Sequence, residues 1–518
     1  MPWTAQASLG WRIFGGYTQR ERSAPATPNV TTDSLFSDPV SDLLENPGGT
    51  TRRWVIGGRA RASGMRAIPE VGFDLEGASV VIPPTAVTQI NELVDASPAR
   101  VWSVRSGVGD DRRGLTTFAV FGNEHVTVGR LTLAARLRFE TLSGAADAAP
   151  RGIQWTSWLP RATVGIRLIG TRGLTATAGY RRSAYLLPLN TLAIGDPAAP
   201  VADVAIWNGL STGPLIARVG PGTGGDAAFT QIDPQLRRPT TDEVLVAVQS
   251  RPFAGLQLEA AGVAKREQSL IGLADTASIP YSSLPVSDPS FEPGSPQGGP
   301  LVTVFNRAPG YYGRDQYLLA NQPGDPATFW GADVNIRAST GPVVVLVGGT
   351  IWSKTVGPAA AVGYLPTEND QDLLGNLLVD PNASTASRGQ LFPDRSHTVK
   401  LALAGRLPWG LRFGALARYQ DGQPFSRLIL VPGLTQGTTA VRSYANGGTA
   451  FTYTGTLDIR LQKTFAAAHA RVAVLLDIYN LPNLGNEVLE YVVAGPAFRT
   501  PLALQPSRTA HVGMRLTF

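Results

Sequence analysis

Cysteine is absent from this 518-residue sequence, which excludes disulfide scaffolds, thiol catalysis and thiolate metal sites. Lysine is nearly absent too, since Lys265, Lys354, Lys400 and Lys463 are the only lysines, and almost all basic residues are arginine. The formal net charge is only +6 and is spread along the chain. This distribution excludes the dense basic patch of a nucleic-acid-binding protein.

Long apolar runs are also missing, because Gly348 and Gly349 interrupt the densest one, residues 343–352. A helical membrane span is therefore not expected. The first residues lack the charged start, apolar core and cleavage site of a secretory signal, so either the protein is not exported or its true start lies upstream. With 57 Gly, 40 Pro and 43% hydrophobic residues, the composition favours an all-β protein with many loops.

Segments of about ten residues alternate between apolar and polar side chains, as β-strands with two different faces do. In one segment Leu457, Ile459 and Leu461 share a face, while Asp458 and Arg460 share the other. The same pattern recurs along the chain, for example at Leu131, Leu133 and Leu137; Val164, Ile166 and Leu168; Val244, Val246 and Val248; Val334 and Ile336; Val399, Leu401 and Leu403; and Val472, Val474, Leu476 and Ile478.

Alternation alone also fits a soluble β-sandwich with one wet face. The connections between strands favour a membrane barrel instead, because tight turns and long loops alternate, as they do at the two rims of such barrels. Tight turns are expected at residues 170–173, 251–255, 339–342, 407–410 and 466–469, and long loops at 188–239, 269–327, 357–394, 421–452 and 481–507.

A large transmembrane antiparallel β-barrel of roughly 15 to 18 recognisable strands is predicted, with short periplasmic turns and long extracellular loops. Strands of about 11 residues, tilted by about 45°, span the apolar band of about 25 Å. Aromatics at strand ends, such as Trp155, Trp158, Trp330, Trp352 and Trp409, suit the headgroup boundary. Charged residues are costly against lipid, so these are expected to face the lumen: Arg136, Arg138, Arg337, Lys400, Arg406, Asp458 and Arg460.

Several motifs resemble TonB-dependent receptors, and most closely the subgroup with an N-terminal carboxypeptidase-regulatory-like domain. The resemblance covers residues 112–518, and residues 1–111 are expected to add N-terminal barrel strands and loops to the same single barrel domain. The motifs that carry it are Thr117-Phe118-Ala119-Val120-Phe121, Asp394-Arg395-Ser396-His397, Tyr419-Gln420-Asp421-Gly422-Gln423-Pro424-Phe425, Leu457-Asp458-Ile459-Arg460-Leu461, Asp477-Ile478-Tyr479-Asn480-Leu481-Pro482-Asn483 and Pro506-Ser507-Arg508-Thr509-Ala510.

The resemblance implies an outer-membrane location and contact with outer-membrane lipid. It also implies that the amphipathic last strand, with Val512, Met514, Leu516 and Phe518 on one face, is the signal read by the barrel-assembly machinery. Family members begin with a plug and a segment that contacts TonB. Neither is recognisable here, so the N-terminal plug and the first strands are expected to be missing, and the TonB complex to be a partner only if a plug lies upstream.

Motifs of enzyme chemistry lack the context that they need. Residues 209–213 match GxSxG around Ser211, but no helix is expected after them. Residues 220–225 match GxGxxG without a preceding strand, which favours a flexible loop. The histidines, His125, His397, His469 and His511, lack metal-ligand spacing. A cluster of oxygen ligands at Glu368, Asn369, Asp370 and Asp372 is interpreted as a solvated loop.

The sequence therefore predicts a monomeric, non-enzymatic receptor barrel that takes up a scarce nutrient, such as a metal chelate, a glycan fragment or a peptide. No cofactor or metal is expected. Residues 322–330 and 421–425 are candidate ligand contacts in extracellular loops. A passive channel and a non-transporting adhesin or scaffold, as expected for a truncated receptor, remain the alternatives.

Overall fold

The fold was examined in a computed structural model of the chain. It describes residues 8–23, 29–33, 44, 48–63, 67–84, 86–169, 173–289, 301–324, 326–358, 381–391, 394–467 and 470–518. The sequence-predicted oxygen cluster at residues 368–372 and His469 lie outside these ranges. Among the described residues, no helix has the length and apolar character needed to cross a membrane.

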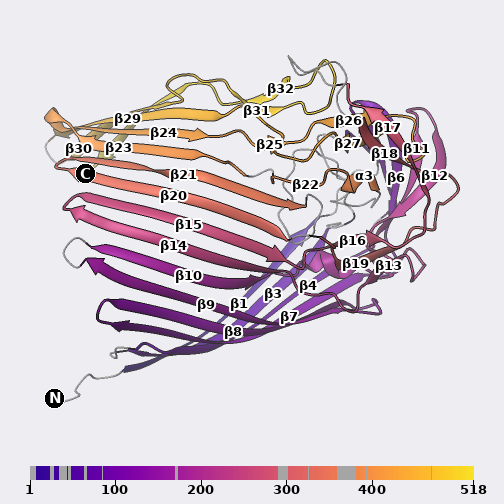
Figure 1. The fold of residues 1–518 in the computed structure, drawn as a ribbon, viewed down its shortest axis with the longest axis horizontal. Helices are drawn as coiled ribbons and strands as arrows, with labels where there is room; N and C mark the ends of the chain where they lie inside the picture. Colours follow the sequence, from indigo (N-terminus) through magenta and orange to yellow (C-terminus); the bar gives the residue numbers. More distant parts are fainter. Residues whose placement is uncertain are drawn as a thin grey trace.

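One large antiparallel sheet forms the curved wall of the molecule (Figure 1). In the described part of the chain it has 17 strands, of which β22 (Arg388–Gly389) is a two-residue piece, leaving 16 wall strands. This number confirms the predicted barrel of roughly 15 to 18 strands. The wall strands are β1 (Ser8–Arg22), β3 (Gly49–Ser63), β4 (Glu70–Ile82), β7 (Asp111–Val128), β8 (Leu131–Ala146), β9 (Ile153–Ile169), β10 (Leu174–Ala184), β14 (Thr240–Phe253), β15 (Leu256–Gln268), β20 (Ala327–Thr340), β21 (Val343–Pro358), β23 (Thr398–Arg406), β24 (Leu411–Gln420), β29 (Thr454–Ala467), β30 (Ala470–Tyr479) and β33 (Thr509–Thr517).

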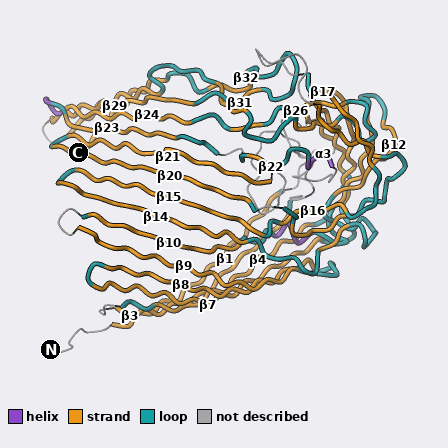
Figure 2. The backbone as a smooth tube through the Cα atoms, viewed as in Figure 1, coloured by secondary structure: helices purple, strands orange, loops and turns teal. Residues whose placement is uncertain are grey.

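Each wall strand pairs with the wall strands before and after it in the chain, so the sheet is a continuous meander (Figure 2). The first and last wall strands are the exceptions: among the described residues, β1 pairs only with β3, and β33 pairs only with β30. Strands from residues 1–111 thus continue the same wall as those from residues 112–518.

The wall strands are joined by short turns at one end and by long segments at the other (Figure 1). Gly129, Gly255 and Gly341 have φ angles of 59°, 88° and 50°, which glycine adopts without steric cost in tight turns. One long-loop position departs from the predicted alternation, since only residues 147–152 join β8 to β9. Both strands are long, at 16 and 17 residues, and they extend the sheet where other strand pairs continue into loops.

Apolar side chains on the outer face of the wall are exposed, as expected for a surface in contact with lipid. Val246, Leu401 and Leu137 are 54%, 41% and 48% exposed. Trp158, Trp330, Trp352 and Trp409 are exposed. Trp409 lies in the tight turn between β23 and β24, whereas Trp352 lies well inside β21 and not at its end. The prediction was wrong for Trp155, which is 5% exposed, because it lies on the inner face and donates a hydrogen bond from Nε1 to the Leu236 carbonyl at 2.9 Å.

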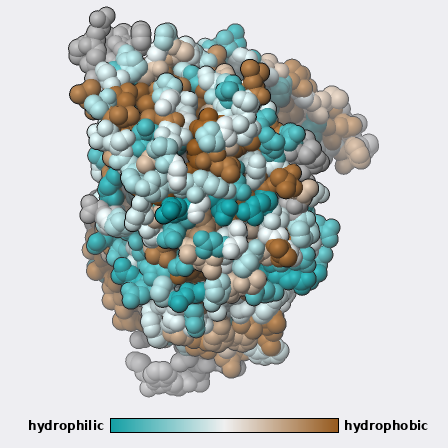
Figure 3. Space-filling view, turned by 90° about the vertical axis from the view of Figure 1, so that its right-hand side faces the viewer, coloured by the Kyte–Doolittle hydropathy of each residue, from teal (hydrophilic) through white to brown (hydrophobic). Residues whose placement is uncertain are grey.

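The long segments fold into an ordered cap at the end of the wall opposite Phe518 (Figure 1). Figure 3 looks onto this end, where hydrophilic and hydrophobic residues are interspersed. Small sheets and short helices build it and the turns: β2 (Asn29–Asp33), β5 (Thr88–Val94), β6 (Ser97–Arg105), η1 (Leu189–Ala193), β11 (Val201–Trp207), β12 (Thr212–Val219), β13 (Thr230–Ile232), β16 (Ile271–Asp275), β17 (Tyr281–Ser287), β18 (Leu301–Arg307), β19 (Tyr317–Asn321), α3 (Pro381–Ser384), η2 (Pro408–Gly410), β25 (Pro424–Phe425), β26 (Leu428–Val431), β27 (Thr439–Arg442), β28 (Thr449–Ala450), β31 (Glu487–Glu490) and β32 (Pro501–Leu504).

The cap has its own hydrophobic cores, whereas the wall has almost none. In one core Ile90 and Trp102 pack against Val204 and Ala217, and all four side chains are fully buried. A second core stacks Phe425 on Phe451 with ring centroids 4.6 Å apart. Burial of this kind is the main stabilising contribution in a water-soluble fold, so the cap is built like a small soluble domain on a membrane wall.

Candidate functional site: the lumen wall

The predicted lumen residues lie on the face opposite the exposed apolar side chains. Arg136 and Arg138 alternate with exposed Leu137 in β8, and Lys400 alternates with exposed Val399 and Leu401 in β23. The remaining predicted positions follow the same rule in their own strands: Arg337 in β20, Arg406 in β23, and Asp458 and Arg460 in β29. By strand periodicity these seven charged side chains share the face opposite the exposed apolar residues, and their assignment to a lumen stays a prediction.

An ion-pair network ties the wall to the cap near Arg138. The Arg138 guanidinium donates to Asp74 at 2.6 Å and to Glu140 at 2.9 Å. Glu140 also accepts from Arg238 at 2.7 Å, and Arg238 donates to Ser157 at 3.1 Å. Arg238 comes from a long cap segment, and sequence reasoning missed it because no local pattern marks a loop residue that returns to the wall.

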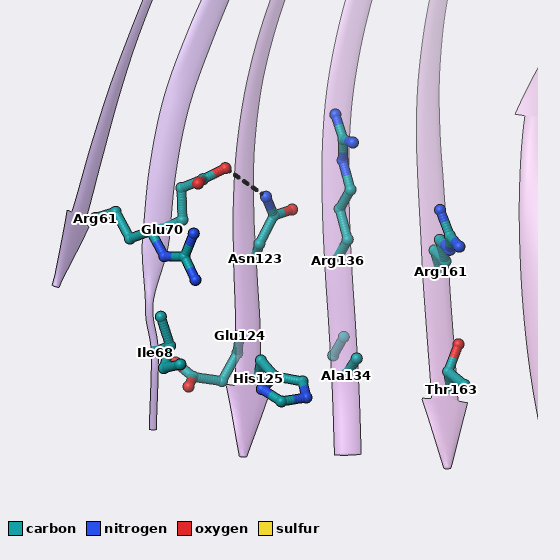
Figure 4. Close-up of a pocket in the computed structure, with 11 residues that line it drawn as sticks. Arg61, Ile68, Glu70, Asn123, Glu124, His125, Ala134, Arg136, Arg161 and Thr163 are labelled. Atoms are coloured by element: carbon teal, nitrogen blue, oxygen red, sulfur yellow. Dashed lines mark hydrogen bonds between the residues drawn. The ribbon is translucent and has the colours of Figure 1, made fainter. Parts of the chain in front are cut away.

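Below this network, toward the tight turns, a hollow of about 330 Å³ opens on the wall (Figure 4). Arg61, Glu70, Asn123, Arg136 and Arg161 line it, from five strands. Asn123 Nδ2 donates to Glu70 Oε1 at 2.8 Å, so one carboxylate of the hollow is already engaged. Arg61 and Arg161 were missed by the sequence reasoning, although strand periodicity with the exposed neighbours Ile56 and Val164 would have assigned them to this face.

A second hollow, of about 640 Å³, lies on β20, β21 and β23. Its polar lining includes Asp333, Asn335, Arg337 and Lys400. The other predicted charges, in β29, are partly paired: Arg460 binds Asp477 through two bonds of 2.5 and 2.7 Å, while Arg418 reaches Asp458 only at 3.9 Å. The wall therefore combines satisfied ion pairs with cations that face water.

Charged groups of the cap are held in place by burial and hydrogen bonds. Although burial raises the pKa of Asp203, hydrogen bonds from Arg218 (2.9 Å) and Tyr312 (2.8 Å) outweigh it and keep that pKa below its usual value. Burial raises the pKa of Asp275 to about 6, against the opposing hydrogen bond from the Ala277 backbone. The pKa values of these two carboxylates are therefore shifted in opposite directions.

The residues predicted to contact a ligand at 421–425 mainly form hydrogen bonds and packing contacts within the protein. Asp421 accepts from Tyr419 at 2.7 Å and contacts His397 Nδ1 at 2.6 Å, and Phe425 is 1% exposed. In the segment 322–330, Gln322 donates its backbone N–H to the Leu270 carbonyl at 2.7 Å, while Trp330 is exposed on the outer face. These segments therefore contribute structure to the cap and the rim.

The enzyme-like motifs lie in tight cap turns. Ser211 belongs to the β11–β12 turn and bonds to Asn208, and a strand rather than a helix follows it. The expectation of a flexible loop at residues 220–225 was wrong for the first four residues, because residues 220–223 are buried. A Cβ on Gly222 would lie 2.1 Å from the Ala199 carbonyl oxygen, so glycine is required there for close packing. Within the described residues no group of three or more His, Cys, Asp or Glu could hold a metal ion.

No model of a protein family and no curated protein sequence matches the chain. Solved structures do match. The outer membrane transporter YddB from Escherichia coli superposes over 98% of this chain and 60% of its own, with a TM-score of 0.55 and 12% identity. The ferric yersiniabactin uptake receptor FyuA from Yersinia pestis covers 99% of this chain and 59% of its own, with a TM-score of 0.48 and 10% identity.

The chain spans about three fifths of the length of these transporters. YddB is an outer membrane transporter, and the sequence predicts an outer-membrane location for this chain. At 12% identity the likeness to YddB concerns the fold, and it agrees with the meandering antiparallel wall, the exposed apolar outer face and the charged inner face. The resemblance noted in the sequence is thus confirmed at the level of architecture: this chain has the barrel fold of TonB-dependent outer-membrane receptors.

Proposed function

We propose that this chain is the membrane barrel of an outer-membrane transporter that takes up a small, scarce nutrient with energy from TonB. The observation that carries the proposal is a transporter-like wall with an apolar outer face and a charged inner face, topped by an ordered cap. A water-filled lumen is expected for two reasons: the inner face carries charged side chains, and barrels of this size enclose an aqueous interior.

The proposal extends to organisation and partners. Residues 1–111 and 112–518 form a single barrel domain, which works as a monomer in outer-membrane lipid. Val512, Met514 and Leu516 on one face of β33, with Phe518 directly after the strand, form the signal for the barrel-assembly machinery, and these four side chains are 54–97% exposed. TonB acts through a plug, and the chain has no enzymatic role.

Uptake by living cells tests this function. The chain, with any upstream reading frame, is expressed in bacteria that lack their own transporters, with and without TonB. Accumulation of three labelled probes is then measured: a ferric chelate, a maltooligosaccharide and a tripeptide. Accumulation of at least one probe only in the presence of TonB is expected. Equal uptake of all three without TonB would refute the proposal.

A passive channel is the second candidate, favoured by the lumen-facing exposure of Arg59, Arg61 and Arg161. Planar-bilayer recordings separate the two functions. A large current that is always open, in the protein purified from outer membranes, indicates a passive channel. A closed or rarely open barrel supports gated uptake.

A further inference from the structure

The sheet register places cations directly opposite cations on the inner face of the wall. Like charges directly opposite each other destabilise a sheet, so neighbouring strands would be expected to place their cations at different positions of the register. Five such pairs nevertheless occur: Arg12 with Arg59, Arg136 with Arg161, Arg161 with Arg181, Lys400 with Arg418, and Arg406 with Arg412. Arg161 is also opposite Arg181 on its other side, which makes a row of three arginines across β8, β9 and β10.

Carboxylates are treated differently on the same face. In the described wall strands, no two carboxylates are opposite each other in register. Arg181 binds Glu243 at 2.7 Å and Arg460 binds Asp477, so the wall does form ion pairs where it has the partners. Pairs of like charge on the inner face of the wall are therefore formed by cations and not by carboxylates in the described wall strands.

Most of these cations have no carboxylate partner in the described chain. No ion pair within 4.0 Å is formed among the described residues by Arg12, Arg59, Arg61, Arg136, Arg161, Lys400, Arg406 or Arg412. Two neighbouring carboxylates are engaged elsewhere, since Asp74 binds Arg138 and Glu70 accepts from Asn123. A third, Glu124, also lines the hollow but forms no ion pair with these cations among the described residues. A polar, solvated lumen tolerates such cations, because water and mobile ions screen them over about 8 to 10 Å.

Aromatic rings contact three of these arginines, Arg12, Arg59 and Arg136. Phe121 packs against the guanidinium carbons of Arg59 and Arg136, at 5.6 and 4.8 Å from its ring centroid. Phe14 packs against those of Arg12 and Arg59, at 6.0 and 5.5 Å. Of these three arginines, Arg136 lines the hollow in Figure 4. Contact with the face of a ring does not use the N–H donors at the edge of a guanidinium group.

We propose that the lumen binds and conducts anions, and that the ligand of this barrel is a small soluble anion carrying phosphate or carboxylate groups. Both groups match the fork of donors on arginine, which binds them through two parallel hydrogen bonds. An anion between Arg136 and Arg161 converts their mutual repulsion into two attractive contacts. The inference rests on the proposed function for its physiological meaning, since it names the class of solute that the barrel takes up.

Equilibrium binding tests the proposal without any transport step. The full chain is purified from outer membranes in an uncharged detergent and titrated calorimetrically with pyrophosphate, with citrate and with sucrose, in low salt. Binding of at least one of the two anions, loss of that binding at high salt, and no binding of sucrose are expected. The two anion titrations show whether phosphate or carboxylate is preferred.

The variant Arg136→Gln with Arg161→Gln removes two charges from the hollow. Its matched control, Arg112→Gln with Arg182→Gln, removes two charges from exposed arginines outside the lumen, which are paired with Asp110 and Asp242. About tenfold weaker anion binding is expected for the wall variant, and a change of less than about twofold for the control. Melting curves of both variants verify that they are folded.

Equal loss of binding in both double variants would overturn the proposal, because the effect would then reflect net charge. So would retention of full affinity in the wall variant, or binding of a polyglutamate peptide without binding of either small anion, which would point to a protein segment as the occupant. Anion binding in a protein that shows no TonB-dependent uptake would leave this inference standing while the proposed function fails.

Discussion

The cap and the lumen wall both use arginine, but they treat its charge in opposite ways. In the cap, Arg100 is 2% exposed and binds Glu92 at 2.7 and 2.9 Å, while Glu92 also accepts from Trp102 at 2.7 Å. In the wall, Arg136 and Arg161 face each other without a carboxylate partner among the described residues. A buried charge must be paired to offset its desolvation, whereas a charge in a wet lumen need not be.

The largest expected effect comes from breaking the buried cap pair. Arg100→Met leaves Glu92 buried without its cation, and a loss of about 3 to 5 kcal/mol in cap stability is expected. Hydrogen exchange of β5 and β6 measures it. Arg105→Met in the same strand is the control, because Arg105 is partly exposed and lies 3.4 Å from Asp203. Equal protection of β5 and β6 in the two variants would contradict the contrast between cap and wall.

A second test asks whether wall cations are tolerated because their face is wet. Val246→Arg in β14 puts a cation on the outer face, at an expected cost of about 2 to 4 kcal/mol near the bilayer centre. Ala247→Arg, one residue further, puts the same side chain on the inner face and is expected to cost much less. Urea unfolding in lipid vesicles compares them, and equal costs would show that the two faces of the wall are not different.

A third test uses pH and the two cap carboxylates. Burial raises the pKa of Asp275 in the folded protein to about 6, above the 3.8 of an unperturbed aspartate. Its contribution to stability is therefore full below about pH 3.8 and is lost as the pH rises through about 6. Asp275→Asn is therefore expected to stabilise the cap at pH 7.5, by on the order of 1 kcal/mol, and to have little effect at pH 4.

Asp203→Asn is the matched comparison, because the pKa of Asp203 is lowered and its contribution is present at neutral pH and lost in acid. It is expected to destabilise the cap at pH 7.5. Thermal melting followed by tryptophan fluorescence at the two pH values measures both variants. The same sign of change for both at pH 7.5 would show that burial and pairing do not govern these carboxylates.

The smallest effect concerns a like-charged pair of the wall. Arg412→Gln removes the repulsion with Arg406, and a gain of about 0.2 to 1 kcal/mol is expected. Arg460→Gln, which instead removes the bidentate partner of Asp477, is expected to give no gain. Urea unfolding in vesicles compares the two. A loss of stability in the Arg412 variant would mean that this cation has an unrecognised partner.

The wall could be predicted from sequence because its rule is local. Alternation at Leu457, Asp458, Ile459 and Arg460 is set by the strand itself, and all four residues lie within β29. The cap could not be predicted in the same way. Residues 220–223 resemble a flexible loop in sequence, and only the packing of Gly222 against Ala199, from a different turn, shows why they are buried.

The candidate site was predicted in part for the same reason. Periodicity predicts that Arg136 and Lys400 are inner-face cations, but it does not predict which residues lie opposite them. Register depends on how neighbouring strands slide against each other, and the pairing of Arg136 with Arg161 appears only once the sheet is formed. Trp155 shows the limit most clearly, since its position near a strand end suits a lipid boundary, while a cap segment covers it from the inside.

The chain-order meander of the wall also has a kinetic consequence. Wall strands pair with near neighbours in the chain, so the wall can form hairpin by hairpin with modest loop-closure cost. The cap joins distant segments: Arg100 donates to the Gln436 carbonyl at 3.2 Å, and Tyr491 donates to Asp95. These contacts cannot form until nearly the whole chain has been synthesised and its strands placed. Completion of the cap is thus a late folding event, and formation of the contact between Tyr491 and Asp95 would report that nearly all strands of the wall are in place.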